Sequence, residues 1–272
     1  MPPKQMFIRK QRPKGLEFSS CQKCNNGTGK SDLVASLLGR LSVDPSADDE
    51  AAEFKKLLSA VRNNVPGLLE EMQIDPTAEK LERKDLPIQE GGGILRANGP
   101  LVTKHMLVFG AKLGFALHYE ALRKVVPPTG GVQPRWFSNA QAARGEIPTG
   151  LFSLLPDTGQ TLKQGSRDVS DQFQYAWALL DEGTPEPQHA LFYATFHRSF
   201  AIAVVSATDR TAFIEKHADR FPLVLPAHFD RESSSSRTAV GRRGTACGPV
   251  SSSAGRSPRG RPFPLTLTDY SG

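Results

Sequence analysis

Two apolar runs joined by three residues decide the fold, and they lie in residues 189–206, which read HALFYATFHRSFAIAVVS. The segments His189–Phe196 and Phe200–Ser206 are rich in aromatic and β-branched side chains, a composition typical of strands. The step His197–Ser199 between them has the length of a hairpin connection. The sequence therefore predicts an antiparallel hairpin at this point.

The segment before the hairpin, Gln172–Leu180, alternates between large apolar side chains and smaller or polar ones. A period of two is typical of a half-buried strand, so this segment is expected to belong to the same sheet. Downstream, Thr208–His217 has the pattern of a capped helix with Phe213 and Ile214 facing inward. Residues 159–230 are therefore expected to form an antiparallel sheet plus a helix.

Residues 43–158 are expected to be mainly helical, because their apolar residues recur at intervals of three and four. In the longest of these helices, Met106, Phe109, Leu113 and Leu117 are expected to face the core, while its glycines weaken the helix or admit a close neighbour. Acidic residues near position 50 are interpreted as solvated helix acids. Together with an earlier helix that follows the N-terminal cysteines, the expected helices are Ser31–Leu41, Ser46–Asn64, Thr103–Lys124 and Ser138–Arg144, with a short turn over Leu68–Met72.

Charge is distributed unevenly along the chain, whose net charge is +6. Residues 1–30 sum to +6, residues 31–230 to −5 and residues 231–272 to +5. Basic chain ends can contact nucleic-acid phosphates by releasing counterions. The bases of the N-terminal part, which we take as candidate DNA or RNA ligands, are Lys4, Arg9, Lys10, Arg12, Lys14, Lys23 and Lys30.

The C-terminal residues 231–272 contain seven arginines and no lysine, with repeated Ser, Gly and Pro. This composition lacks the apolar periodicity that a packed core needs, so we expect disorder. Two other interpretations stay open: an Arg-Gly segment that binds RNA, and a GC-rich reading frame translated out of phase. No function is assigned to this tail.

Several classes of protein are excluded by composition. No run approaches the roughly 18 apolar residues that a membrane span needs. The basic N-terminus has no apolar segment behind it, which argues against a secretory signal. Only three cysteines occur in 272 residues, so a disulfide scaffold is not expected and a cytoplasmic location is the default.

The densest chemistry lies at Cys21-Gln22-Lys23-Cys24-Asn25-Asn26-Gly27. Two thiolates three positions apart at a knuckle can bind one Zn²⁺, and Gly27 permits the turn that follows. A structural zinc needs four protein ligands, so Cys21 and Cys24 supply half of a site. The six histidines are far from this pair in sequence, and Cys247 lies in the tail.

Met1-Pro2-Pro3-Lys4, Leu16-Glu17-Phe18 and the cysteine segment together resemble the second half of an HNH-endonuclease-like treble clef, as in a group of uncharacterised bacterial proteins. The resemblance implies that Cys21 and Cys24 are the second zinc pair. It places Asn25 at a catalytic position where relatives carry a metal-binding His or Asn, and Lys4 beside the active-site strand. In that family a histidine activates water and a divalent metal such as Mg²⁺ stabilises the leaving phosphate oxygen.

The chain departs from this family pattern in two ways. It begins where the catalytic histidine is expected, and the first cysteine pair is absent. Either the recorded start is internal to a longer gene, or the chain is a truncated or decayed relative. In both cases we expect residues 1–42 to be a partial zinc-knuckle segment. Binding of zinc and of nucleic acid is expected rather than intact phosphodiester hydrolysis.

Two alternatives of other classes remain. Gly27-Thr28-Gly29-Lys30-Ser31 imitates the end of a phosphate-binding loop, although Cys24 stands where the first glycine of that motif belongs. The second alternative is a non-enzymatic interaction module whose working part is the sheet. His105, His118, His189 and His197 are interpreted as structural, and the aromatic residues of the sheet as packing rather than base stacking. The expected class is α+β, with a partial treble-clef knuckle, a helical middle, a C-terminal antiparallel sheet and a disordered tail.

Overall fold

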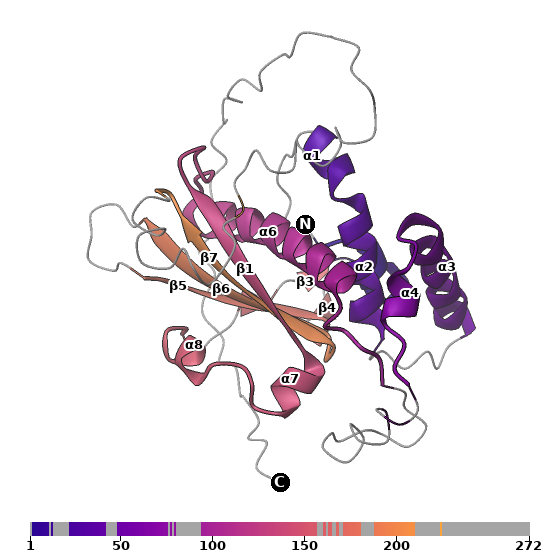
Figure 1. Cartoon of the computed structure of the whole chain (residues 1–272). Helices are drawn as coiled ribbons and strands as arrows, with labels where there is room; N and C mark the ends of the chain where they lie inside the picture. The colour runs from indigo at the N-terminus through magenta and orange to yellow at the C-terminus, as the bar shows by residue number, and fades with distance from the viewer. Residues whose placement is uncertain are drawn as a thin grey trace.

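The computed structural model of the chain contains an antiparallel sheet with the longer helices packed on one of its faces (Figure 1). The structure describes residues 2–10, 12, 22–41, 48–75, 77, 79, 94–156, 160–161, 163–164, 167–168, 171–180, 188–209 and 224. Within these ranges helix and strand are mixed, which confirms the predicted α+β class at that level. The treble-clef knuckle is a finer prediction, which this agreement of class does not test.

The main sheet has five strands in the order β1-β7-β6-β5-β2, and every neighbouring pair is antiparallel. The predicted hairpin is confirmed: Phe196 pairs with Phe200, and His197 in the turn has a positive φ of 50°. Two further strands pair with each other in a small separate ribbon. The bounds are β1 Gly131–Ser138, β2 Gln160–Thr161, β3 Lys163–Gln164, β4 Arg167–Asp168, β5 Phe173–Leu179, β6 His189–Phe196 and β7 Phe200–Ala207.

Strand β1 lies in the part of the chain expected to be mainly helical, and the sequence did not predict it. It pairs with β7 along its whole length. Val132 exchanges two hydrogen bonds with Val224 on the outer side, so the main-chain nitrogen of Pro134, two residues on, also faces outward. A proline can join a sheet at this position because its missing N–H costs no bond to the neighbouring strand.

Apart from the helix expected over Thr208–His217, the predicted helices are present with small shifts of their ends. A helical turn also covers part of the cysteine segment, and one short helix, α8, was not predicted. The N-terminal part adds two 3-10 turns, η1 Lys4–Met6 and η2 Ile8–Lys10. The bounds of the α-helices are α1 Gln22–Gly27, α2 Gly29–Arg40, α3 Asp48–Asn64, α4 Leu68–Glu71, α6 Pro100–Leu122, α7 Asn139–Ala143 and α8 Thr149–Ser153.

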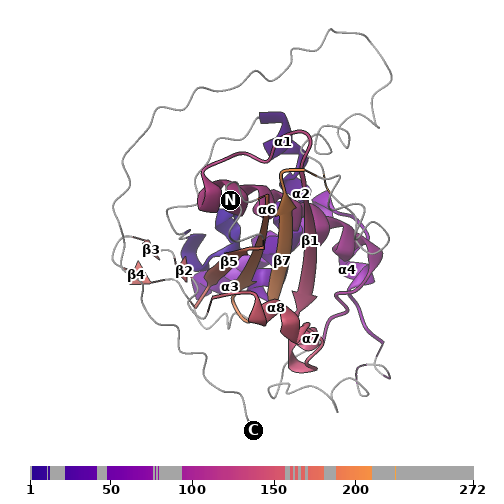
Figure 2. The same ribbon diagram turned by 90° about the vertical axis from the view of Figure 1, so that its left-hand side faces the viewer.

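Helix α6 lies directly on the sheet, as both views show (Figures 1 and 2). A Cβ on Gly114 would clash with Val204 Cγ1, and one on Gly110 would lie 2.9 Å from Pro134 Cβ. These glycines therefore allow α6 to lie close to the sheet, which was one of the two interpretations of their presence in the sequence. Helix α2 packs on α6, and α3 packs on α2.

The amino end of α6 is bound by a side chain from another helix. Both carboxylate oxygens of Glu71 in α4 accept hydrogen bonds, from the main-chain N–H groups of Leu101 and Val102, each at 2.9 Å. These N–H groups have no partner within the helix, and a negative charge near them is favourable because it opposes the positive end of the helix dipole. The contact fixes α4 against α6.

One core joins the predicted segments. The buried cluster contains residues from 1–42, from 43–158 and from 159–230, so these parts pack together rather than around separate cores. Phe109 of α6 meets Phe196 edge to face at a centroid distance of 5.6 Å, and Phe196 stacks on Phe200 at 4.8 Å. The predicted inward residues Met106, Phe109, Leu113 and Leu117 are all buried. Phe192, Phe196 and Phe200 of the hairpin are therefore core residues, in agreement with the predicted packing role.

Some predictions fall outside the described residues. These are the tail 231–272 and most of the helix expected over Thr208–His217. No helix within the described ranges has the length and apolar character needed to cross a membrane.

Candidate functional site

The N-terminal segment, residues 2–10, lies across the helical layer and the end of the β6–β7 hairpin. Its apolar side chains Met6 and Phe7 are fully buried, whereas Lys4, Arg9 and Lys10 are exposed. Burial of the two large side chains is the main force that holds the segment in place. Its basic side chains are thus presented to solvent on a fixed backbone.

A buried ion pair binds this segment to the helices. Arg40 at the end of α2 and Glu50 near the start of α3 form a salt bridge with side-chain exposures of 5% and 8%. Arg40 Nη1 also donates to the carbonyl of Phe7 at 3.3 Å, and Glu50 Oε1 accepts from the main-chain N–H of Arg9 at 2.8 Å. Glu50 was interpreted from sequence as a solvated acid, which is wrong: it is buried because the N-terminal segment covers it.

The sheet side binds the same segment through two more side chains. His197 Nε2, in the hairpin turn, donates to the carbonyl of Met6 at 2.9 Å. The main-chain N–H of Ile8 donates to Gln172 Oε1 at 3.0 Å. Burial lowers the pKa of His197, although the bond to Met6 opposes this shift. Main-chain groups of Met6 and the three residues after it are therefore each bound by a different element of the fold.

The backbone bends sharply just after these contacts. Arg9 and Lys10 have positive φ angles of 53° and 56°, a conformation that side-chain-bearing residues adopt at a cost. A strained conformation persists only when surrounding contacts hold it, and here Glu50 binds the main chain of Arg9. The bend carries Lys10 back over α3.

A basic pocket of about 260 Å³ lies where the N-terminal segment, α2 and α3 meet. Four of its lining residues are basic and one is acidic, and an apolar wall from α3 completes it. The charge of Arg40 is balanced by the buried Glu50, so Arg9, Lys10 and Lys56 against Glu53 leave an excess of two positive charges in the lining, and such a pocket attracts anions. The lining residues are Gln5, Arg9, Lys10, Arg40, Glu53, Phe54, Lys56, Leu57 and Ala60.

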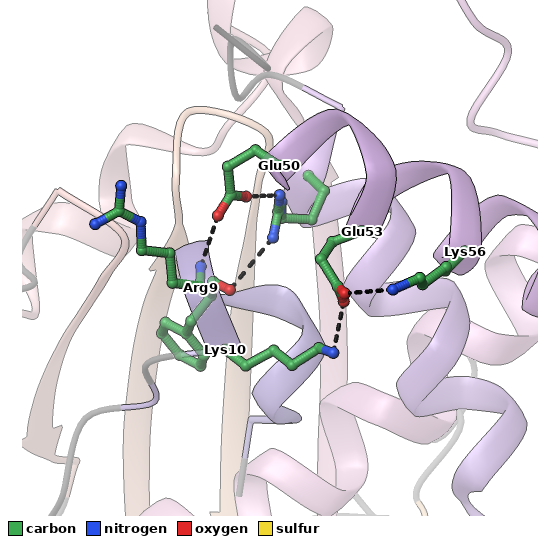
Figure 3. Close-up of polar contacts among 7 residues, drawn as sticks. Arg9, Lys10, Glu50, Glu53 and Lys56 are labelled. Carbon is green, nitrogen blue, oxygen red and sulfur yellow. Dashed lines mark hydrogen bonds and ion pairs between the residues drawn. The ribbon is translucent and has the colours of Figure 1, made fainter. Parts of the chain in front are cut away.

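Glu53 is the single acid of the basic pocket, and two lysines hold it (Figure 3). Lys10 Nζ lies 2.5 Å from Glu53 Oε2, and Lys56 Nζ lies 3.0 Å from Glu53 Oε1. Hydrogen bonds from Lys10 and then Lys56 lower the pKa of Glu53 to about 2. Its carboxylate is therefore ionised throughout the physiological range. In Figure 3 the guanidinium of Arg9 points away from this carboxylate.

The structure brings only part of the predicted basic set to this pocket. Arg9 and Lys10 line it, and Lys4 is exposed on the same N-terminal segment. Lys30 is exposed on the first turn of α2. That turn lies ten residues from Arg40, or about 15 Å along the helix. Arg12 is half-buried, Lys14 lies outside the described residues, and Lys23 is described by its backbone alone.

Within the cysteine segment, the described residues Gln22–Gly27 form helix α1. Cys24 lies within α1, Cys21 lies outside the described residues, and Gly27 ends α1 without a positive φ. Within the described ranges, no group of three or more His, Cys, Asp or Glu side chains is placed to hold a metal ion. Two thiolates do not complete a zinc site, so zinc and a divalent metal stay predictions. Asn25 is exposed on α1, where its carbonyl accepts a bond from Thr28.

The residues of the phosphate-loop alternative are also mostly helical. Gly27 ends α1 and Gly29 begins α2, so a single residue separates the two helices. Ser31, whose hydroxyl would bind Mg²⁺ in such a loop, is buried and shares a 3.0 Å hydrogen bond with His105 Nδ1. Next to it, Asp32 binds Lys112 at 2.6 Å, and burial raises the pKa of Asp32. These contacts join α2 to α6.

Sequence reasoning missed four residues of this site: Arg40, Glu50, Glu53 and Lys56. The only local signal was the spacing of Glu53 and Lys56, which on a helix is typical of an ordinary surface pair. Comparison with protein-family models, with curated protein sequences and with solved structures found no match to this chain. Any function assigned to the chain therefore rests on the geometry and charge of this site.

Proposed function

We propose that this chain binds nucleic acid through the exposed bases of its N-terminal segment and the basic pocket beside it. The observation that carries the proposal is the pocket lining of four bases against one acid, at the edge of a segment whose backbone is fixed. Pre-positioned lysines and arginines contact phosphates without first losing the freedom of a flexible tail. The proposal retains the part of the HNH-like expectation that concerns binding, and it assigns no hydrolysis.

Contacts of this kind recognise the phosphate backbone and carry no sequence information. Their free energy comes from counterion release, so affinity falls steeply as salt rises. Each phosphate neutralised adds about 0.9 to the slope of log K against log salt for duplex DNA and about 0.7 for a single strand. Lys4, Arg9 and Lys10 together predict a slope of roughly two to three on either substrate.

Fluorescence anisotropy of the full chain with a labelled 20-nucleotide strand, and with the matching duplex, between 50 and 300 mM NaCl tests the proposal. Replacing Lys4, Arg9 and Lys10 together by Gln is expected to lower affinity at least about tenfold at 100 mM and to reduce the salt slope. A triple variant of Arg62, Lys104 and Lys124, all exposed elsewhere, removes the same charge and serves as the control.

Two results would overturn the proposal. One is equal loss of affinity in the two triple variants, because binding would then depend on net charge alone. The other is loss of binding when the seven arginines of 231–272 become Gln while the N-terminal bases are intact, since the contact would then lie in the C-terminal residues.

A further inference from the structure

We infer that the basic pocket binds one phosphate group of a nucleotide chain, and that Glu53 holds the place of this phosphate when no ligand is bound. The inference rests on the proposed nucleic-acid binding and assigns one contact within it. Three features of the pocket support it: the position of Glu53, the buried Arg40 behind it and the apolar wall of α3.

Glu53 presents its two carboxylate oxygens to two ammonium groups, as a phosphate would. Lys10 contacts one oxygen and Lys56 contacts the other, at 2.5 and 3.0 Å. All three side chains reach solvent, with exposures of 30% for Glu53, 50% for Lys10 and 73% for Lys56. Exposed ion pairs contribute little to stability, so an incoming anion can replace the carboxylate at small cost.

Arg40 differs from the two lysines because its charge is buried. It lines the pocket, its salt bridge with Glu50 is almost inaccessible to solvent, and its Nε has no hydrogen-bond partner among the described residues. Breaking a buried pair is costly, so Arg40 stays bound to Glu50. Its pair with Glu50 therefore keeps one wall of the pocket fixed, whereas the exposed lysines opposite can move.

The size and wall of the pocket identify the class of ligand. A volume of about 260 Å³ suits a phosphate with part of its sugar. Phe54, Leu57 and Ala60 form an apolar side, which a free phosphate would leave unused but a sugar or base can contact. A phosphodiester within a chain and a phosphate at a chain end present the same oxygens, so both are included in the test.

The test measures affinity of the full-length Glu53→Gln variant for a labelled 20-nucleotide DNA strand at 100 mM NaCl. Removing the carboxylate frees Lys10 and Lys56 and is expected to raise affinity about three- to tenfold, the size of one close charge interaction that is fully exposed to water. Glu120→Gln removes the same charge from its ion pair with Arg123 at the end of α6, outside the pocket, and is expected to leave affinity nearly unchanged.

Lysine variants test the same site in the opposite direction. Lys56→Ala is expected to lower affinity about threefold or more, whereas Lys55→Ala, on the adjacent residue of α3 and outside the pocket lining, is expected to have little effect. A strand with a 5′-phosphate is compared with one ending in a hydroxyl. Equal gains from Glu53→Gln for both strands identify an internal phosphodiester, and a gain only with the 5′-phosphate identifies a terminal one.

The outcomes separate the two proposals. If the unmodified chain binds no strand even at 50 mM NaCl, the proposed function fails. If it binds, but Glu53→Gln matches Glu120→Gln and Lys56→Ala matches Lys55→Ala, nucleic-acid binding stands and the phosphate site is overturned. Thermal melting of each variant checks that the fold is intact.

Discussion

Arg40 and Glu50 form a buried ion pair, and each partner also binds the main chain of the N-terminal segment. The pair therefore joins three parts of the chain: the end of α2, the start of α3 and residues 7–9. A buried ion pair is weak support for stability by itself, because desolvation of the two charges opposes their attraction. Its clear consequence here is positional, since the exposed bases of the proposed interface lie on the segment that it holds.

Removing one partner of this pair should destabilise the chain strongly. Glu50→Ala leaves the Arg40 guanidinium buried without its carboxylate and the Arg9 N–H without an acceptor. We expect a loss of about 3–5 kcal/mol in the free energy of unfolding, measured by urea titration. The double variant Arg40→Met with Glu50→Leu removes both charges, and it should recover part of this loss.

Recovery should be incomplete, because the double variant still leaves the Arg9 N–H without its Glu50 acceptor, whereas the Phe7 carbonyl keeps its hydrogen bond from the Lys10 N–H. A remaining deficit of about 1–3 kcal/mol is expected from the unsatisfied Arg9 N–H. Single and double variants of equal stability would show that burial of an unpaired charge is not what destabilises Glu50→Ala.

Gly99 provides a second prediction, at the start of α6. A Cβ on Gly99 would overlap the carboxylate carbon of Glu71, so only a residue without a side chain admits this carboxylate to the helix end. Gly99→Ala should therefore displace Glu71 and lower the free energy of unfolding by about 1–2 kcal/mol, the value of the lost helix cap.

The matched control for this prediction is Glu71→Ala, which removes the cap directly and should cost about 1–2 kcal/mol. Combining Gly99→Ala with Glu71→Ala tests the coupling by urea denaturation. The double variant should be little less stable than Glu71→Ala alone, because the clash has lost its partner. Strictly additive losses would contradict the proposed contact.

Much of the fold could be predicted because it is encoded locally. The β6–β7 hairpin has a period of two and a short connection, and α2, α3 and α6 carry helical stripes. Strand β1 could not be predicted in this way. Val132, Gln133 and Pro134 are all buried, so alternation is lost, and a proline argues against a strand unless the edge position is already known.

The candidate site was predictable only in part, for a similar reason. The basic character of Lys4, Arg9 and Lys10 is visible in the sequence. That Glu50 is buried against Arg40 depends on how α2 and α3 fold against each other and on the N-terminal segment that covers both. Contacts between elements of this kind leave no periodic signal, so ordinary helix acids and buried ones look alike.

His118 gives a third prediction, which concerns pH. It is fully buried on α6, its Nδ1 shares a 2.8 Å hydrogen bond with Ser206 Oγ of β7, and its Nε2 has no partner among the described residues. Burial lowers the pKa of His118 from 6.5 to about 4. A protonated imidazole at this place would have a charge and a proton donor that nothing satisfies, so the folded chain keeps it neutral.

Between pH 6.5 and pH 4 the unfolded chain therefore binds a proton at this residue that the folded chain does not. Stability is complete above pH 6.5 and falls as pH is lowered toward 4, by about 2–3 kcal/mol for this residue. Urea unfolding of the wild type and of His118→Gln across this range measures the effect. His197 is present in both proteins, so the difference between the two curves isolates His118. The variant should lose the corresponding part of the pH dependence whatever its stability at neutral pH, and parallel curves would show that His118 titrates normally in the folded chain.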